Sequence, residues 1–188
     1  MPARLPNLAW ALRAALVAVL LPLLADCGPK RDEFAPVCPR PGLLAEAADL
    51  DRYRPSTSPG GGHDLTDLIL HARIIGVKGA CQPGDTKTQL AVALAVSLDL
   101  TRGPAMPGRE TDLGFFIAVT EGEAILDKHI FSTHLAFPPN LDHVVWTSDP
   151  TNLVLPISPT KSGAAYSILV GFQLTPDELA QNRARERR

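Results

Sequence analysis

The stretch KTQLAVALAVSLDLTR, residues 87–102, decides the fold class. Its larger apolar side chains all fall on one parity: Leu90, Val92, Leu94, Val96, Leu98 and Leu100. The other parity holds only small or polar residues, namely Gln89, Ala91, Ala93, Ala95, Ser97, Asp99 and Thr101. Because successive side chains of a strand point to opposite faces, this pattern predicts a long β-strand with one buried face. A buried, alanine-rich helix is the competing interpretation, and the strict alternation disfavours it.

The same alternation predicts six further strands, over residues 65–77, 113–120, 124–137, 143–148, 151–157 and 164–175. A disturbed phase near Lys128-His129-Ile130 indicates a β-bulge. Turn-forming segments such as CQPGD, TEGEA and SDPTN separate the strands, and no helical crossover lies between them. The sequence therefore predicts an all-β fold, an antiparallel immunoglobulin-like β-sandwich of about seven strands over residues 64–175.

One segment near the end of this region, LVLPISPTKSGAAYSILVGFQL (residues 153–174), resembles a pattern in fibronectin type III domains. In that family a leucine and a proline precede a tyrosine that opens the next strand and closes a corner with its hydroxyl. The resemblance implies that Leu155, Pro156 and Tyr166 take those places.

Residues 1–26 have the layout of a secretory signal peptide. Arg4 and Arg13 precede the apolar run AALVAVLLPLLA, residues 14–25. As a helix this run would measure about 18 Å, which is shorter than the ~30 Å hydrocarbon core of a bilayer. A permanent membrane-spanning helix is therefore the weaker alternative. No Ala-x-Ala cleavage motif follows the run.

The end of the run, Leu24-Ala25-Asp26-Cys27, resembles the lipobox of bacterial lipoproteins. In that family the cysteine thiol receives a diacylglycerol, the signal is removed before it, and the new N-terminus is acylated. The resemblance implies a lipid anchor at Cys27 and a place in the bacterial cell envelope, facing the periplasm. Gly28, where family members retained in the inner membrane have aspartate, implies the outer membrane. Asp26 stands where the family has a small residue.

The chain has three cysteines, Cys27, Cys38 and Cys81. If Cys27 carries lipid, an even pair remains in an oxidising compartment, which predicts a Cys38–Cys81 disulfide worth about 3–4 kcal/mol. A metal site is the competing interpretation, and two widely spaced cysteines do not favour it. Residues 27–63, punctuated by proline and glycine, are predicted to be a tether, in which 43–52 has the composition of a short helix.

The remaining features favour no catalysis, no metal and no cofactor. The net charge of −2 provides no basic surface for nucleic acid. No nucleophile motif occurs, and the five histidines lack close ligand spacing: His63, His71, His129, His134 and His143. Residues 176–188 are predicted to form a C-terminal helix and tail, capped by Thr175, with only Leu179 to bury.

The loop RGPAMPGRETD, residues 102–112, is the predicted partner-contact site. It carries the charged residues Arg102, Arg109, Glu110 and Asp112, and a methionine, Met106, that is expected to be exposed between two prolines. An ordinary solvent-exposed connection is the alternative. The sequence thus predicts a membrane-anchored envelope lipoprotein whose sandwich is an interaction or assembly module for an unidentified envelope protein. A soluble periplasmic ligand-binding domain, or an envelope enzyme or metal protein, remain as alternatives.

Overall fold

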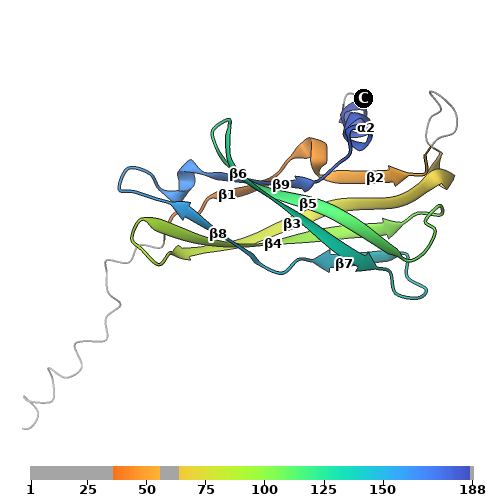
Figure 1. The fold of residues 1–188 in the computed structure, drawn as a ribbon, viewed down its shortest axis with the longest axis horizontal. Coiled ribbons are helices and arrows are strands. Elements are labelled where there is room, and N and C mark those ends of the chain that lie inside the picture. Colours follow the sequence, from red (N-terminus) through yellow and green to blue (C-terminus); the bar gives the residue numbers. More distant parts are fainter. Residues whose placement is uncertain (1–35, 56–63, 187–188) are drawn as a thin grey trace, which may run out of the picture. The chain divides into compact units, whose positions relative to one another are not determined.

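The computed structural model describes residues 36–55 and 64–186, and residues 36–188 form one compact unit. The predicted signal peptide and Cys27 lie outside the described residues. The fold is an all-β sandwich of two sheets with one C-terminal helix, so the predicted fold class is confirmed (Figure 1). Nine strands are present among the described residues, against about seven expected.

The first sheet has the order β1-β9-β5-β6. Its strands are β1 (Arg40–Leu43), β9 (Ser167–Phe172), β5 (Glu110–Glu121) and β6 (Ala124–Ala136). The second sheet places β2 (Asp49–Tyr53) beside β3 (Leu68–Pro83) and β3 beside β4 (Gln89–Arg102). Both β7 (His143–Thr147) and β8 (Thr151–Pro156) pair with the free side of β4. All pairs are antiparallel except that of β1 with β9.

The core confirms the period-two interpretation of β4. Burial alternates strictly along most of this strand, and the six inward Leu and Val side chains are at most 3% exposed. They pack against Phe115 and Ile117 of β5 and Ile168 and Val170 of β9 in one cluster. Burial of each such side chain stabilises the folded state by about 1.5–3 kcal/mol, so β4 makes a large contribution to the core.

The corner expected between β8 and β9 is present. Tyr166 is 1% exposed and its hydroxyl donates a hydrogen bond of 2.6 Å to the carbonyl oxygen of Pro156. Leu155, two residues before the connection, is also buried. This bond joins the end of the second sheet to the start of β9 in the first.

The predicted tether over residues 27–63 is wrong for residues 36–53, which belong to the sandwich. β1 pairs with β9, β2 pairs with β3, and Leu50 is fully buried. The helix expected over 43–52 is absent, and a short 3₁₀ turn, η2 (Ala45–Ala47), stands in its place. Helix propensity is a weak preference, and cross-strand pairing of Leu50 with Ala72 overrides it here. Pro41 is compatible with β1 because that strand lies at a sheet edge.

The bulge lies close to its expected position but not at it. Val119 pairs with Asp127 and Thr120 with Ile125, so Leu126 is the extra residue, two positions before Lys128. The disturbed phase at 128–130 in the sequence is therefore the consequence of a bulge that precedes it.

The helix α2 (Pro176–Glu186) begins as predicted. The Glu178 backbone N–H donates to Thr175 Oγ1 at 3.3 Å, and the Thr175 backbone N–H donates to Glu178 Oε2 at 2.8 Å, which together form a capping box. The expectation that only Leu179 is buried is wrong, because Glu178 and Asn182 are buried and Leu179 is only partly buried. Asn182 Nδ2 donates to the carbonyl oxygens of Glu46 and Asp49, and Arg52 lies 3.3 Å from Glu178, so polar contacts dock the helix.

The strands define two ends of the sandwich. The entry end contains residues 36–39 and the turns 84–88, 122–123 and 157–163. The distal end contains the loops 103–109 and 137–142. Figure 1 shows the β3–β4 turn and the β8–β9 connection on the left and the β4–β5 and β6–β7 loops on the right.

Candidate functional site

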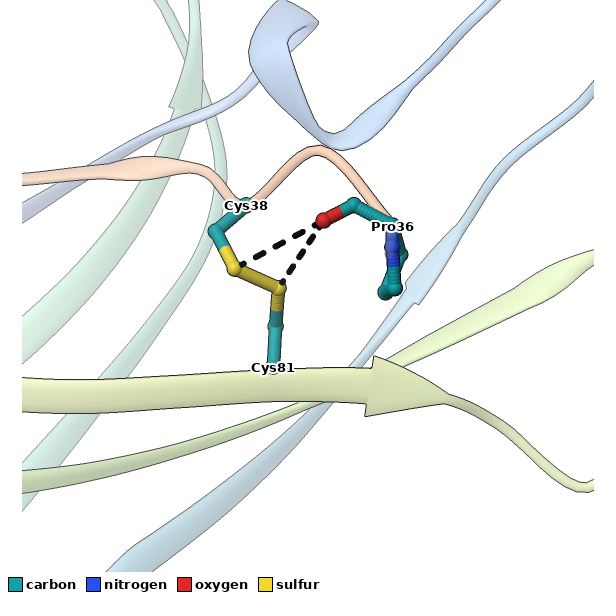
Figure 2. Close-up of a disulfide and its surroundings, with 3 residues drawn as sticks. All are labelled: Pro36, Cys38 and Cys81. Atoms are coloured by element: carbon teal, nitrogen blue, oxygen red, sulfur yellow. Dashed lines mark hydrogen bonds between the residues drawn. A yellow bond between two sulfur atoms is a disulfide. The ribbon is translucent and has the colours of Figure 1, made fainter. Parts of the chain in front are cut away.

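The entry end contains the predicted disulfide, and the Cys38–Cys81 bond is confirmed. Cys38 lies two residues before β1 of the first sheet, and Cys81 lies on β3 of the second, with a Cα–Cα distance of 5.7 Å. The bond therefore ties the incoming chain across both sheets (Figure 2). The Pro36 carbonyl oxygen lies 3.9 Å from Cys38 Sγ and 3.7 Å from Cys81 Sγ. A disulfide sulfur carries no proton, so these are packing contacts that hold Pro36 against the bond.

Next to the disulfide, the β8–β9 connection closes over the incoming chain. A side chain at Gly163 would begin 2.1 Å from the carbonyl oxygen of Val37, so only glycine allows this approach. Lys161 lies 2.7 Å from Glu121 at the β5–β6 turn and 4.6 Å from the centre of the Tyr166 ring. The hydrogen bond to Glu121 is the main reason that the pKa of Lys161 is raised. The entry end is thus held by one covalent bond and several polar contacts.

The predicted contact loop lies at the distal end, and the expectation that Met106 is exposed is wrong. Met106 is 5% exposed and belongs to the core. The loop folds inward because the Ala105 backbone N–H donates to Leu68 O at 2.9 Å and the Met106 N–H donates to Gly103 O. Gly103 permits this, since a side chain there would begin 2.0 Å from Leu68 O.

The two arginines of this loop are also engaged within the domain. Arg102 donates to the carbonyl oxygens of Gly108 (2.8 Å) and Met106 (3.2 Å). Arg109 donates to three carbonyl oxygens of the facing loop and to a carboxylate: Phe137 O, Pro138 O, Leu141 O and Asp142 Oδ1. The planar guanidinium with several donors suits this task. These residues therefore hold the two distal loops together within the domain, whereas the sequence predicted that they contact a partner.

Glu110 and Asp112, in contrast, extend into solvent, with 69% and 78% of their side chains exposed. His134 of β6 lies between them, 2.8 Å from Asp112 and 3.6 Å from Glu110. The hydrogen bond to Asp112 is the largest cause of a raised pKa at His134.

Every histidine that the structure describes lies beside an aspartate. The pairs are His71 with Asp51, His129 with Asp127, His134 with Asp112, and His143 with Asp99. Three of these pairs cross between strands, so they depend on register and leave no motif in the sequence. Within the described ranges, no three His, Cys, Asp or Glu side chains converge to hold a metal ion. His63 lies outside those ranges.

A groove of about 630 Å³ runs between β2 and α2. Its charged lining residues carry both signs: Asp51, Arg52, Arg54, Asp177 and Glu178. Arg52 is already engaged by Glu178 and by the carbonyl oxygen of Asp112. The lining of the groove therefore shows no preference for an anionic or a cationic ligand.

Comparisons with protein-family models, with curated proteins and with solved structures find no match for this chain. Among the helices described here, none is long and apolar enough to cross a membrane. The functional argument therefore rests on the chain's own residues.

Proposed function

We propose that this protein is a lipid-anchored lipoprotein of the bacterial cell envelope, held at a membrane through Cys27, whose sandwich is a protein-interaction or assembly module. The observation that carries the proposal is the Cys38–Cys81 disulfide. It supports an oxidising compartment, and it leaves Cys27 as the one remaining cysteine, at the end of an apolar run.

The non-catalytic part of the proposal is supported by how the polar groups of the described residues are used. The arginines of the distal loops bind backbone carbonyls, and the histidines pair with aspartates. No buried side-chain polar atom that the structure describes lacks a hydrogen-bond partner. These polar groups are thus used in contacts within the domain, as we expect of a scaffold.

The test is the intact mass of the mature protein from membranes of a Gram-negative host expressing the full chain. We expect a chain that begins at Cys27 and carries the added mass of acyl groups. The Cys27→Ala variant removes the acceptor thiol and should carry no acyl mass, with the Cys38–Cys81 bond intact. A mature wild-type chain without lipid, or one that begins elsewhere, overturns the proposal and favours the soluble periplasmic domain.

Asp26→Ala sharpens this test because it places a small residue before the cysteine. We expect the processed, acylated fraction to rise relative to wild type in pulse–chase labelling. An unchanged fraction shows that Asp26 does not limit processing.

A further inference from the structure

The segment that joins Cys27 to the folded domain is shorter than the predicted tether, because residues 36–53 belong to the sandwich. The entry segment begins at Pro36, nine residues after Cys27, and Cys38 is bonded to β3. Nine residues span at most about 32 Å, however they are arranged. β4, which runs from the entry end to the distal end, has 14 residues and measures about 48 Å.

These two lengths limit how the domain can be oriented with respect to anything that holds Cys27. If lipid held Cys27 at a membrane surface, Pro36 would lie within the reach of the link. The domain cannot then stand on its distal end, because Pro36 would be farther from the surface than the link extends. Only orientations with the entry end close to the membrane, or with the domain on its side, satisfy the link.

The entry end also exposes apolar side chains at the tip of the β5–β6 hairpin. One row across the first sheet consists of Arg40, Ser167, Thr120 and Ile125, and both the incoming chain and the 122–123 turn lie beyond it. Ile125 is 67% exposed and the bulged Leu126 is 50% exposed. The tip of this hairpin therefore presents two adjacent apolar side chains that are each at least half exposed.

We infer that the entry end faces a lipid surface and that Ile125 and Leu126 contact it. The inference rests on the proposed lipid at Cys27 and adds an orientation and a contact surface to that function. The distal loops then point away from the membrane, toward the proposed protein partner.

Charge around the tip indicates the kind of lipid surface that it fits. Glu121, Glu123 and Asp127 flank the two apolar residues, and Lys161 is paired with Glu121 and His129 with Asp127. Lys128, two residues beyond Leu126, adds a further positive charge. Charges of both signs thus lie around the tip, and the described residues there form no basic cluster that would attract an anionic surface. The tip therefore fits neutral, zwitterionic headgroups.

The experiment uses a tryptophan probe in purified protein whose acylation has been verified by mass. The probe is Leu126→Trp, and the matched control is Leu141→Trp in the distal loop, because the two leucines are 50% and 53% exposed. Each variant is placed in phosphatidylcholine vesicles with or without brominated acyl chains. Trp146 of the domain gives a background in every sample, so each response is compared with that of wild type. We expect the Leu126→Trp emission to shift to shorter wavelength on vesicle binding and to be quenched by bromine more than wild type. The Leu141→Trp emission should be quenched no more than wild type.

A second variant tests the link itself. Insertion of 20 Gly and Ser residues between Ala35 and Pro36 keeps the lipid but raises the maximum reach to about 100 Å. We expect this insertion to abolish most of the difference between the two probes. Equal quenching of the two probes with the natural link, or no quenching of either, overturns the inference while acylation stands. Undiminished quenching of Leu126→Trp with the long link overturns the link as its cause, and absence of acyl mass overturns both proposals.

Discussion

The two ends of the sandwich close by different chemistry. At the entry end a covalent bond ties the incoming chain to β3, and Tyr166 fixes the adjacent corner. At the distal end Arg102 binds backbone carbonyls of its own loop and Arg109 binds those of the facing loop, and no disulfide is present among the described residues there. A disulfide acts mainly by restricting the unfolded chain, whereas charged hydrogen bonds act in the folded state and depend on solvent. The difference matters for a tethered domain, because any pull through Cys27 would reach the entry end first.

Removal of the disulfide should have the largest effect. The double variant Cys38→Ala/Cys81→Ala frees a 43-residue separation and should lower the free energy of unfolding by about 3–4 kcal/mol. For a domain of this size the melting temperature should fall by about 10 °C, which calorimetry measures. The matched control is reductant, which should lower the melting temperature of wild type and leave the double variant unchanged. A double variant as stable as wild type would show that β1 is held without the bond.

The distal end should lose less when its main contact is removed. Arg109→Ala removes one donor from three carbonyls and from Asp142, of which Pro138 O keeps the Leu141 N–H and Asp142 keeps Arg102. These remaining donors and the partly exposed position limit the cost to about 2 kcal/mol. Arg54→Ala is the control, because Arg54 is 60% exposed and its closest carboxylate, that of Asp67, is 3.8 Å away; it should change stability by less than about 0.5 kcal/mol. Chemical denaturation measures both. Equal effects of the two substitutions would contradict a structural role for Arg109.

This contrast also explains what the sequence could predict. The alternation of β4 and the leftover cysteine pair are local or countable features, so the fold class and the disulfide follow from them. The role of Arg109 depends on carbonyl oxygens about 30 positions away, and carbonyls carry no residue identity. Met106 appeared exposed between prolines because the burial of the loop depends on the hydrogen bond from Ala105 to Leu68.

The N-terminal boundary was missed for a related reason. Strands β1 and β2 have four and five residues, too few to show a period, and their partners come from β9 and β3. Ala- and Leu-rich composition then favoured a helix over strands that only tertiary pairing specifies.

A smaller effect is expected from Tyr166→Phe at the entry end. The substitution keeps the buried ring and removes the donor to Pro156 O, which should cost about 1 kcal/mol. Tyr166→Leu also removes ring packing and the contact with Lys161, so it should cost more. Both are measured by chemical denaturation. A neutral Tyr166→Phe would show that packing, and not the hydrogen bond to Pro156 O, holds this corner.

The smallest expected effect is a pH dependence of stability that comes from His134 at the distal end. His134 at the distal end is exposed, and its hydrogen bond to Asp112, followed by the charges of Asp112 and Glu110, raises its pKa above the usual value. Because the folded protein binds this proton more tightly than the unfolded chain, the stabilisation is complete below the unfolded pKa of about 6.5 and is lost as pH rises through the folded pKa. Proton NMR titration of the His134 ring should give a midpoint above that of a free histidine, and Asp112→Asn should lower it. His134→Gln should remove this part of the pH dependence of unfolding while the response to reductant at the entry end stays the same. If the midpoint of His134 is instead unaffected by Asp112→Asn, the pair does not form in solution, and the distal loops depend on the arginines alone.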